Sequence, residues 1–168
     1  MPASAALRKS SFAPVADAGA RLLILGSLPG EMSLRIGQYY GNPQNQFWRL
    51  MGVALGRELP ETYEARLLAL QSAGVALWDV VASAVRRGSL DAGIRDHQPN
   101  PLAEFVATLP RLQAVAFNGK TSAAIGGRAL ADAPDLELIA LPSSSPAYTL
   151  SFERKAAAWR QLRRFLEM

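Results

Sequence analysis

Four short apolar runs divide the sequence and set the first expectation about its fold. They cover residues 21–26, 74–81, 112–120 and 136–148, and the last run continues into a loop rich in Ser and Pro. Three of the four are continuously apolar rather than alternating, which is typical of strands buried on both faces. Parallel sheets contain such strands, because their crossover helices cover both faces of the sheet. We therefore expect an α/β fold.

Segments in which apolar residues recur every three or four positions lie between these runs, and this spacing predicts helices. In the second helix, Leu67, Leu68 and Leu70 should face the core, whereas in the last helix Lys155 falls on the basic, outer side. The pattern predicts five helices: Asn45–Gly56, a helix that starts at Pro60, 101–108, 121–131 and Phe152–Glu167.

The length of 168 residues suits one domain. We expect residues 1–20, which are small and polar, to be a flexible N-terminal segment, and 21–168 to form the single domain. The chain has no cysteine, which excludes disulfides, a thiol nucleophile and cysteine-ligated metal sites. Its apolar runs are too short to span a bilayer, and residues 1–12 lack the apolar core of a secretion signal. A cytoplasmic protein is the simplest prediction.

The formal net charge is +4 and the isoelectric point is about 9.8. A basic balance of this kind favours a polyanionic partner, and nucleic acid is the first candidate.

Unusual polar stretches follow each of the four predicted strands. They are "GSLPGEMSLRIGQYYGNPQNQFW", "DVVASAVRRGSLD", "NGK" and "PSSSPAY". In a parallel sheet, ligands bind beyond the carboxyl ends of the strands. The four loops are therefore expected to meet at one edge of the sheet and to form one site.

The side chains in these loops exclude several classes of site. The only histidine, His97, lies in a polar loop, and no G-x-S-x-G motif surrounds a serine, so a serine hydrolase is not indicated. The stretch "GSLPGEMS" at 26–33 lacks the phosphate-loop ending G-K-[ST], and the G-x-G-x-x-G fingerprint is absent from the sequence. One histidine without cysteine supplies a zinc site poorly.

What remains in the loops is mostly uncharged. Asn42, Asn45 and Asn118 offer hydrogen bonds without titrating near neutrality, and Tyr40 offers a ring on which a planar ligand can stack. Asn45 could equally be a helix cap, and the "GSLD" turn at 88–91 could be purely structural. A pocket of amides and one ring suits a nucleobase removed from its stack.

Four motifs together resemble a known family. The stretches "LILGSLPGEMSLRIGQYYGNPQNQFW", "LWDVV…RRGSLDAGI", "AFNGKTS" and "LPSSSPAY" are similar to those of the uracil-DNA glycosylase superfamily, in its hypoxanthine-DNA glycosylase branch. The resemblance implies a three-layer α/β/α sandwich with a four-stranded parallel sheet. It also implies hydrolysis of the N-glycosidic bond of a deaminated base in DNA, which leaves an abasic site, without a metal or other cofactor.

The resemblance also implies roles for particular residues. Asn45 is the catalytic candidate, with Asn42 and Asn118 as further candidates, and Tyr40 would stack on the base. Uracil-specific relatives have an aspartate in the first motif, whereas this chain has Ser27-Leu28-Pro29; close relatives often have a histidine where this chain has Asn42. The base-binding set is Gly26, Ser27, Leu28, Pro29, Gly30, Tyr40 and Asn118, and the DNA-binding set is Ser143, Ser144, Ser145 and Tyr148.

With no carboxylate assigned, the sequence predicts catalysis by placement and fixed dipoles. The carbonyl of Asn45 would orient the attacking water, and the rate should then be flat across mildly acidic to mildly basic pH. A bell-shaped profile would instead point to Glu31 or Asp91. Two alternatives stay open at this point: a hydrolase of free nucleosides or nucleotides, and a nucleic-acid-binding domain without activity. We expect a monomer whose partner is DNA containing deaminated bases.

Overall fold

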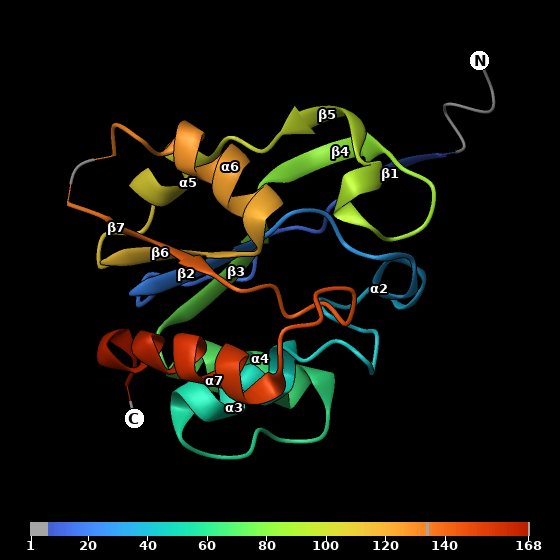
Figure 1. Ribbon diagram of the computed structural model, residues 1–168. Helices are drawn as coiled ribbons and strands as arrows, with labels where there is room; N and C mark the ends of the chain where they lie inside the picture. The colour runs from blue at the N-terminus through green and yellow to red at the C-terminus, as the bar shows by residue number, and fades with distance from the viewer. Residues whose placement is uncertain (1–6, 134, 168) are drawn as a thin grey trace.

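The computed structural model describes residues 7–133 and 135–167. Its centre is a four-stranded parallel sheet in the order β3-β2-β6-β7 (Figure 1). Each strand falls within one of the four apolar runs, so this prediction is confirmed. The strands are β2 (Leu22–Gly26), β3 (Val75–Asp79), β6 (Ala114–Asn118) and β7 (Glu137–Leu141).

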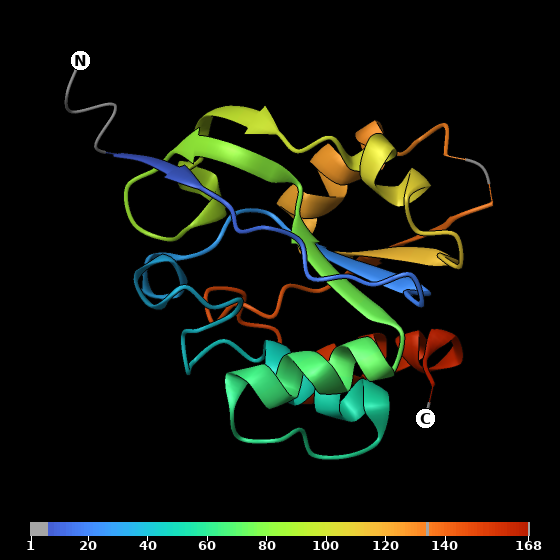
Figure 2. The same ribbon diagram turned by 180° about the vertical axis from the view of Figure 1, so that it is seen from behind.

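Alternate residues of the sheet enter two separate cores. Leu22 and Ile24 of β2 belong to a cluster with the helices α3 (Phe47–Leu55), α4 (Tyr63–Ser72) and α7 (Phe152–Trp159). Leu23 and Leu25 pack on the other face with α5 (Leu102–Ala107) and α6 (Lys120–Ala129). Figures 1 and 2 show these two groups of helices on opposite sides of the sheet. The predicted three-layer arrangement is confirmed, and burial of apolar side chains on both faces drives it.

All five predicted helices are present, with small changes at their ends. A further short helix, α2, occupies part of the first loop, which is the segment 27–46 between β2 and α3. The last helix continues as the 3₁₀ segment η2. Their bounds are α2 (Glu31–Ile36), α3 (Phe47–Leu55), α4 (Tyr63–Ser72), α5 (Leu102–Ala107), α6 (Lys120–Ala129), α7 (Phe152–Trp159) and η2 (Arg160–Phe165).

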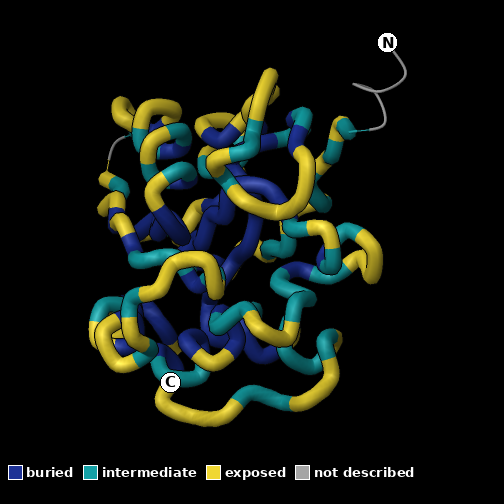
Figure 3. Tube along the Cα trace, turned by 45° about the vertical axis from the view of Figure 1, so that its right-hand side comes forward, coloured by how far each residue is buried: buried dark blue, intermediate teal, exposed yellow. Residues whose placement is uncertain are grey.

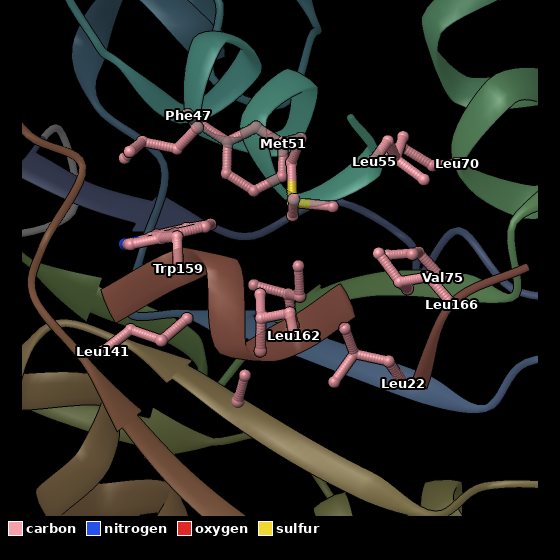
Figure 4. Close-up of a cluster of buried hydrophobic side chains, with 14 of the residues drawn as sticks. Leu22, Phe47, Met51, Leu55, Leu70, Val75, Leu141, Trp159, Leu162 and Leu166 are labelled. Atoms are coloured by element: carbon pink, nitrogen blue, oxygen red, sulfur yellow. The ribbon is translucent and has the colours of Figure 1, made fainter. Parts of the chain in front are cut away.

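The core between α3, α7 and the sheet contains the largest buried side chains. Trp159 and Phe47 are both fully buried, and their rings meet edge to face at 5.8 Å. Figure 4 shows Trp159 and Leu162 between Phe47 and Met51 of α3 on one side and the strands on the other. Truncating a ring in such a position costs about 3–5 kcal/mol, so this layer holds α3 and α7 firmly to the sheet.

Two inner-face predictions were wrong. Leu68 was expected in the core but is 64% exposed, because the buried residues of α4 are Ala69 and Leu70. Lys155 was expected on the outer face but is 1% exposed. Its ammonium group is buried because it donates to the Gln46 side chain and to the backbone oxygen of Ser145, at 2.9 and 3.1 Å.

A second, antiparallel sheet was not predicted. It has the order β1-β4-β5 and lies near α5 and α6 (Figure 1). Its strands are β1 (Arg8–Ser10), β4 (Val81–Val85) and β5 (Arg95–Pro99). All five residues of β5 are exposed, so no apolar pattern marked that strand, and the sequence was interpreted there as a polar loop.

Part of the N-terminal segment is also structured. It was expected to be flexible, whereas β1 pairs with β4 and Trp78 donates its indole N–H to the backbone oxygen of Phe12 at 3.0 Å. Residues 1–6 lie outside the described residues, and the domain boundary at residue 21 stays a prediction.

Exposed loops surround the buried strands, as Figure 3 shows. Within residues 7–133 and 135–167, no helix combines the length and the apolar character that a bilayer crossing requires.

Candidate active site

A cavity of about 850 Å³ opens at the carboxyl edge of the parallel sheet. Its lining includes the last residues of β2, β3, β6 and β7, which are Gly26, Asp79, Asn118 and Leu141. The loops after all four strands therefore meet in one cavity. The structure brings Tyr40, Asn42, Asn45 and Asn118 together there, along with 26–30 and 143–145 and Tyr148.

One side of the cavity, the amide wall, consists of Tyr40, Asn45, Asn118 and Ser144. The Asn118 amide donates to the Ser144 hydroxyl at 2.9 Å and to the Tyr40 hydroxyl at 3.3 Å. Ser144 in turn donates its hydroxyl to Asn45 Oδ1 at 2.8 Å and its backbone N–H to Asn118 Oδ1 at 2.9 Å. These bonds fix four side chains from three loops in one arrangement.

The orientation of the Asn45 amide follows from its partners. Oδ1 accepts from the backbone N–H of Phe47 at 2.9 Å as well as from Ser144. Both donors must face oxygen, so this atom has no lone pair left. The amide nitrogen forms no hydrogen bond within the part of the chain that the structure describes. Asn45 thus satisfies the first turn of α3 and also presents an N–H₂ group at the cavity.

Tyr40 lies between the core and the cavity. Its ring stacks on Phe47 with centroids 3.8 Å apart and planes 12° apart, so one face is covered and only the other can meet a base. Its backbone is in the left-handed region, with φ of 54°, which is uncommon for a bulky residue. Tyr39 points away into the core, where its hydroxyl donates to the backbone oxygen of Ala13 at 2.7 Å. Of the two adjacent tyrosines, Tyr39 therefore packs in the core and Tyr40 contributes its ring to the site.

A second side of the cavity, the acidic wall, is lined by Ser27, Asp79 and Asp91, and the buried Arg86 lies close to these residues without lining the cavity. The Ser27 hydroxyl donates to Asp91 Oδ1 at 2.5 Å. Asp79 ends β3 and is 4% exposed. Burial, together with the like charge of Asp91 and against the pull of Arg86, raises the pKa of Asp79 to about 7. Burial also raises the pKa of Asp91, although Ser27 and Arg86 oppose that rise.

Arg86 shapes the first loop from inside. It is 1% exposed and donates to the backbone oxygens of Leu28, Pro29 and Gly88. Burial lowers the pKa of Arg86, while Asp91, Glu31 and Asp79 favour its charged form. The loop held in this way leaves the backbone N–H groups of Leu28 and Gly30 without hydrogen bonds inside the described ranges, and both residues line the cavity.

Gly26 is required by the approach of the two walls. A Cβ atom there would lie 2.6 Å from Asp79 Oδ1 and 3.0 Å from the Tyr40 hydroxyl oxygen. Real Cβ contacts are not that short, so only glycine lets these side chains meet at the end of β2.

The predicted DNA-binding residues do not share one environment. Tyr148 is 41% exposed at the mouth of the cavity, and Ser143 and Ser145 are half-buried. Ser144 is 1% exposed, so its side chain belongs to the amide wall and not to the surface. Asn42 lines the cavity, but its side chain accepts from the backbone N–H of Gln44 at 2.9 Å, which closes its own turn.

Sequence reasoning missed Asp79, Arg86 and Lys155. Asp79 is a charged residue at the end of an apolar run, and that signal could have been used. Nothing local marks Arg86 or Lys155, because their partners lie far away in the sequence.

Comparison with known proteins identifies the family. The sequence model of the uracil DNA glycosylase superfamily matches residues 13–164 of this chain. The chain belongs to this superfamily. Its relatives include a hypoxanthine DNA glycosylase of Methanosarcina barkeri, 39% identical over 91% of this chain and 96% of the relative. A hypoxanthine DNA glycosylase of Methanosarcina acetivorans is 38% identical over 90% and 95% of the two chains.

A solved structure from the same superfamily agrees with the fold. The solution NMR structure of a candidate uracil DNA glycosylase from Methanosarcina acetivorans superimposes with a TM-score of 0.83. The two chains are 36% identical, and the match covers 94% of this chain and 98% of the other. The resemblance seen in the four motifs is thus confirmed.

Proposed function

We propose that this protein is a monofunctional DNA N-glycosylase that releases hypoxanthine from DNA and leaves an abasic site. The observation that carries the proposal is the amide wall, an uncharged and pre-positioned set of side chains inside a cavity at the sheet edge. Membership of the superfamily and the two hypoxanthine DNA glycosylase relatives support the same activity.

Cleavage of the N-glycosidic bond produces an oxocarbenium-like sugar. The attacking water therefore needs to be positioned more than it needs to be activated. In the sequence-based mechanism the carbonyl of Asn45 orients this water. That carbonyl already accepts two hydrogen bonds, so we assign the role to the free Asn45 N–H₂ group, which holds the water through its oxygen. Ser144 keeps the amide in this orientation.

The base is held by groups that need no charge. The open face of Tyr40 stacks on it, which is worth about 1–3 kcal/mol. The free N–H groups of Leu28 and Gly30 donate to its oxygen as negative charge develops. One donor of this kind contributes roughly 3 kcal/mol to the rate. Asn118 acts indirectly, because both of its amide atoms are engaged by Ser144 and Tyr40.

Three residues at the mouth of the cavity would contact the DNA outside the extruded base. Ser143, Ser145 and Tyr148 border the mouth of the cavity and would contact the DNA backbone or fill the space that the extruded base vacates. A monomeric state and a cytoplasmic location stay predictions.

The test uses oligonucleotides that carry a single deoxyinosine, deoxyuridine or deoxyxanthosine, in single- and double-stranded form, followed by alkaline cleavage of abasic sites. We expect strand scission at deoxyinosine and none at normal bases. Free deoxyinosine is the control: release of hypoxanthine from the nucleoside but not from DNA would indicate a nucleoside hydrolase. Binding of the oligonucleotide without any product would indicate a nucleic-acid-binding domain.

A further inference from the structure

Neither oxygen of the Asp79 carboxyl group accepts a hydrogen bond within the described residues; Oδ2 is buried, and Oδ1 lies beside Gly26 at the cavity. Among residues 7–133 and 135–167, only two buried side-chain polar atoms lack a hydrogen bond: Arg21 Nε and Asp79 Oδ2. Arg21 directly precedes β2 and does not line the cavity, and its Nη2 pairs with Glu167 Oε1 at 3.4 Å. Asp79 lines the cavity itself.

An unpaired buried carboxyl is costly, and most native structures avoid it. The residues around Asp79 hold its backbone in place but leave its carboxyl group without a hydrogen-bond donor. Its backbone oxygen accepts from the Asn100 side chain at 2.7 Å, which holds the strand end, and Gly26 opposite has no side chain that could cover the carboxyl. The position therefore has a fixed backbone and a side chain with unused hydrogen-bonding capacity.

The charged and titratable groups around Asp79 come from two loops. In the loop between β4 and β5, Asp91 places a second negative charge nearby and Arg86 supplies a positive one. From the loop after β2, the Tyr40 hydroxyl approaches the Asp79 carboxyl at Gly26, whereas the Tyr39 hydroxyl is bonded to the backbone oxygen of Ala13. Burial and Asp91 favour the protonated acid, and Arg86 alone opposes it, so the pKa rises to about 7. Asp91 cannot take the same role as readily, because its carboxylate already accepts from Ser27.

We propose that Asp79 is a catalytic residue that donates a proton to N7 of the departing hypoxanthine. This proposal rests on the proposed function above. As the bond between N9 and C1′ breaks, its electron pair moves into the five-membered ring, and the Asp79 proton arrives at N7 of that ring. The base then leaves as a neutral molecule. Water forms the new bond to C1′ and gives up one proton to solvent, and a solvent proton restores Asp79.

This role supplements what the amide wall can do. Amides donate hydrogen bonds but transfer no proton near neutrality, whereas a carboxylic acid with a pKa close to the working pH is well matched to proton transfer. Charge on the leaving purine is thus removed by the acidic wall, while the amide wall positions water and base.

The experiment measures single-turnover release of hypoxanthine from deoxyinosine-containing DNA between pH 5 and 9. For the wild-type protein we expect a constant rate at low pH, a midpoint near 7 and a fall of about tenfold per pH unit above it. Asp79→Asn should be about a hundredfold slower at pH 5.5 and independent of pH, so that the two rates converge near pH 9. Asp91→Asn is the matched control, and its midpoint should move to lower pH because a like charge is lost.

A second substrate tests the acceptor atom. In 7-deazadeoxyinosine the N7 position is carbon, so wild type and Asp79→Asn should release this base at equal rates. A hundredfold difference on that substrate would overturn the proposal, and so would a flat wild-type profile on deoxyinosine. Binding to 2′-fluoro-deoxyinosine DNA, followed by fluorescence anisotropy, checks that Asp79→Asn folds and binds.

Two further outcomes are distinguishable. If Asp79→Asn does not fold, the wild-type pH profiles on deoxyinosine and 7-deazadeoxyinosine decide, because only the first should bend near pH 7. If the wild-type protein releases nothing from deoxyinosine, the proposed function fails and the role of Asp79 fails with it. If release is efficient but pH-independent, only the role of Asp79 fails.

Discussion

The two walls of the cavity solve different physical problems with different side chains. In the amide wall, Asn118 and Ser144 exchange three hydrogen bonds with each other and with Asn45, so its capacity is spent on holding a shape. In the acidic wall, Asp79 retains an oxygen that bonds to nothing in the described residues. Rigidity and reactivity are therefore separated: one wall is uncharged and held by its own hydrogen bonds while presenting the Asn45 N–H₂ group, and the other contains a carboxyl group without a hydrogen bond.

The strongest test of the amide wall is Asn45→Ala. Loss of its free N–H₂ group should slow release of hypoxanthine by about 100- to 1,000-fold, or roughly 3–4 kcal/mol. The shape of the pH profile should stay the same, because no titrating group is removed. Gln44→Ala is the control, since this neighbouring amide is exposed, and its rate should match the wild type within about twofold. Full activity of Asn45→Ala would remove the amide wall from catalysis.

For the acidic wall, Asp79→Asn should change stability in a pH-dependent way. The folded pKa of about 7 lies above the ordinary value of 3.8, so the folded state keeps a proton that the unfolded state loses. Wild-type stability therefore falls as pH rises from about 4 to 7 and is level above that. Relative to the wild type, the variant should gain roughly 4 kcal/mol between pH 4 and pH 8.

Urea unfolding at the two pH values measures this gain. Equal differences between variant and wild type at pH 4 and pH 8 would show that Asp79 is ionised in the folded protein at both pH values and does not hold a proton near neutrality.

The junction of the two walls is tested by Gly26→Ala. The new methyl group would push against Asp79 Oδ1 and the Tyr40 hydroxyl, and overpacking of this kind costs about 1–3 kcal/mol. We expect a lower unfolding temperature together with reduced activity. Gly127→Ala is the matched control: its methyl group meets no atom within 4 Å and it lies in α6, so it should stabilise the fold by up to about 1 kcal/mol.

The smallest effect is expected from Tyr40→Phe. The substitution keeps the ring and removes only the hydroxyl that accepts from Asn118 at 3.3 Å. Loss of this one hydrogen bond should cost about 0.5–1.5 kcal/mol of free energy. Tyr40→Ala should cost more, because the stacking surface is lost as well. Measured affinities for 2′-fluoro-deoxyinosine DNA give the comparison, and equal affinities for the two variants would mean that Tyr40 does not stack on the base.

The sequence predicted the main sheet because its signal is local. A strand such as Leu22–Gly26 is buried on both faces and must be apolar throughout. The second sheet carries no such signal, since β5 is exposed along its length and is held by backbone pairing with β4. Strand pairing of this kind depends on partners elsewhere in the chain.

The candidate site was predicted in its loops but not in its electrostatics. Asn45, Asn118 and Tyr40 stood out by residue type and position. Asp79 could be seen in the sequence, but its missing hydrogen bond, its burial and its closeness to Gly26 exist only after folding. Lys155 shows the same limit, because helical spacing placed it outside whereas two distant oxygen acceptors bring it inside.

The buried Lys155 ammonium group joins three segments. Lys155 lies in α7 and donates hydrogen bonds to the backbone oxygen of Ser145, in the loop that follows β7, and to the side chain of Gln46, the residue after Asn45. Gln46 also donates its backbone N–H to Ser144. Residues 143–145, which we propose to contact DNA, are therefore bonded directly to the start of α3. The proposed contact with DNA and the alignment of the Asn45 amide are in this way coupled through the Lys155 ammonium group and the backbone bond between Gln46 and Ser144.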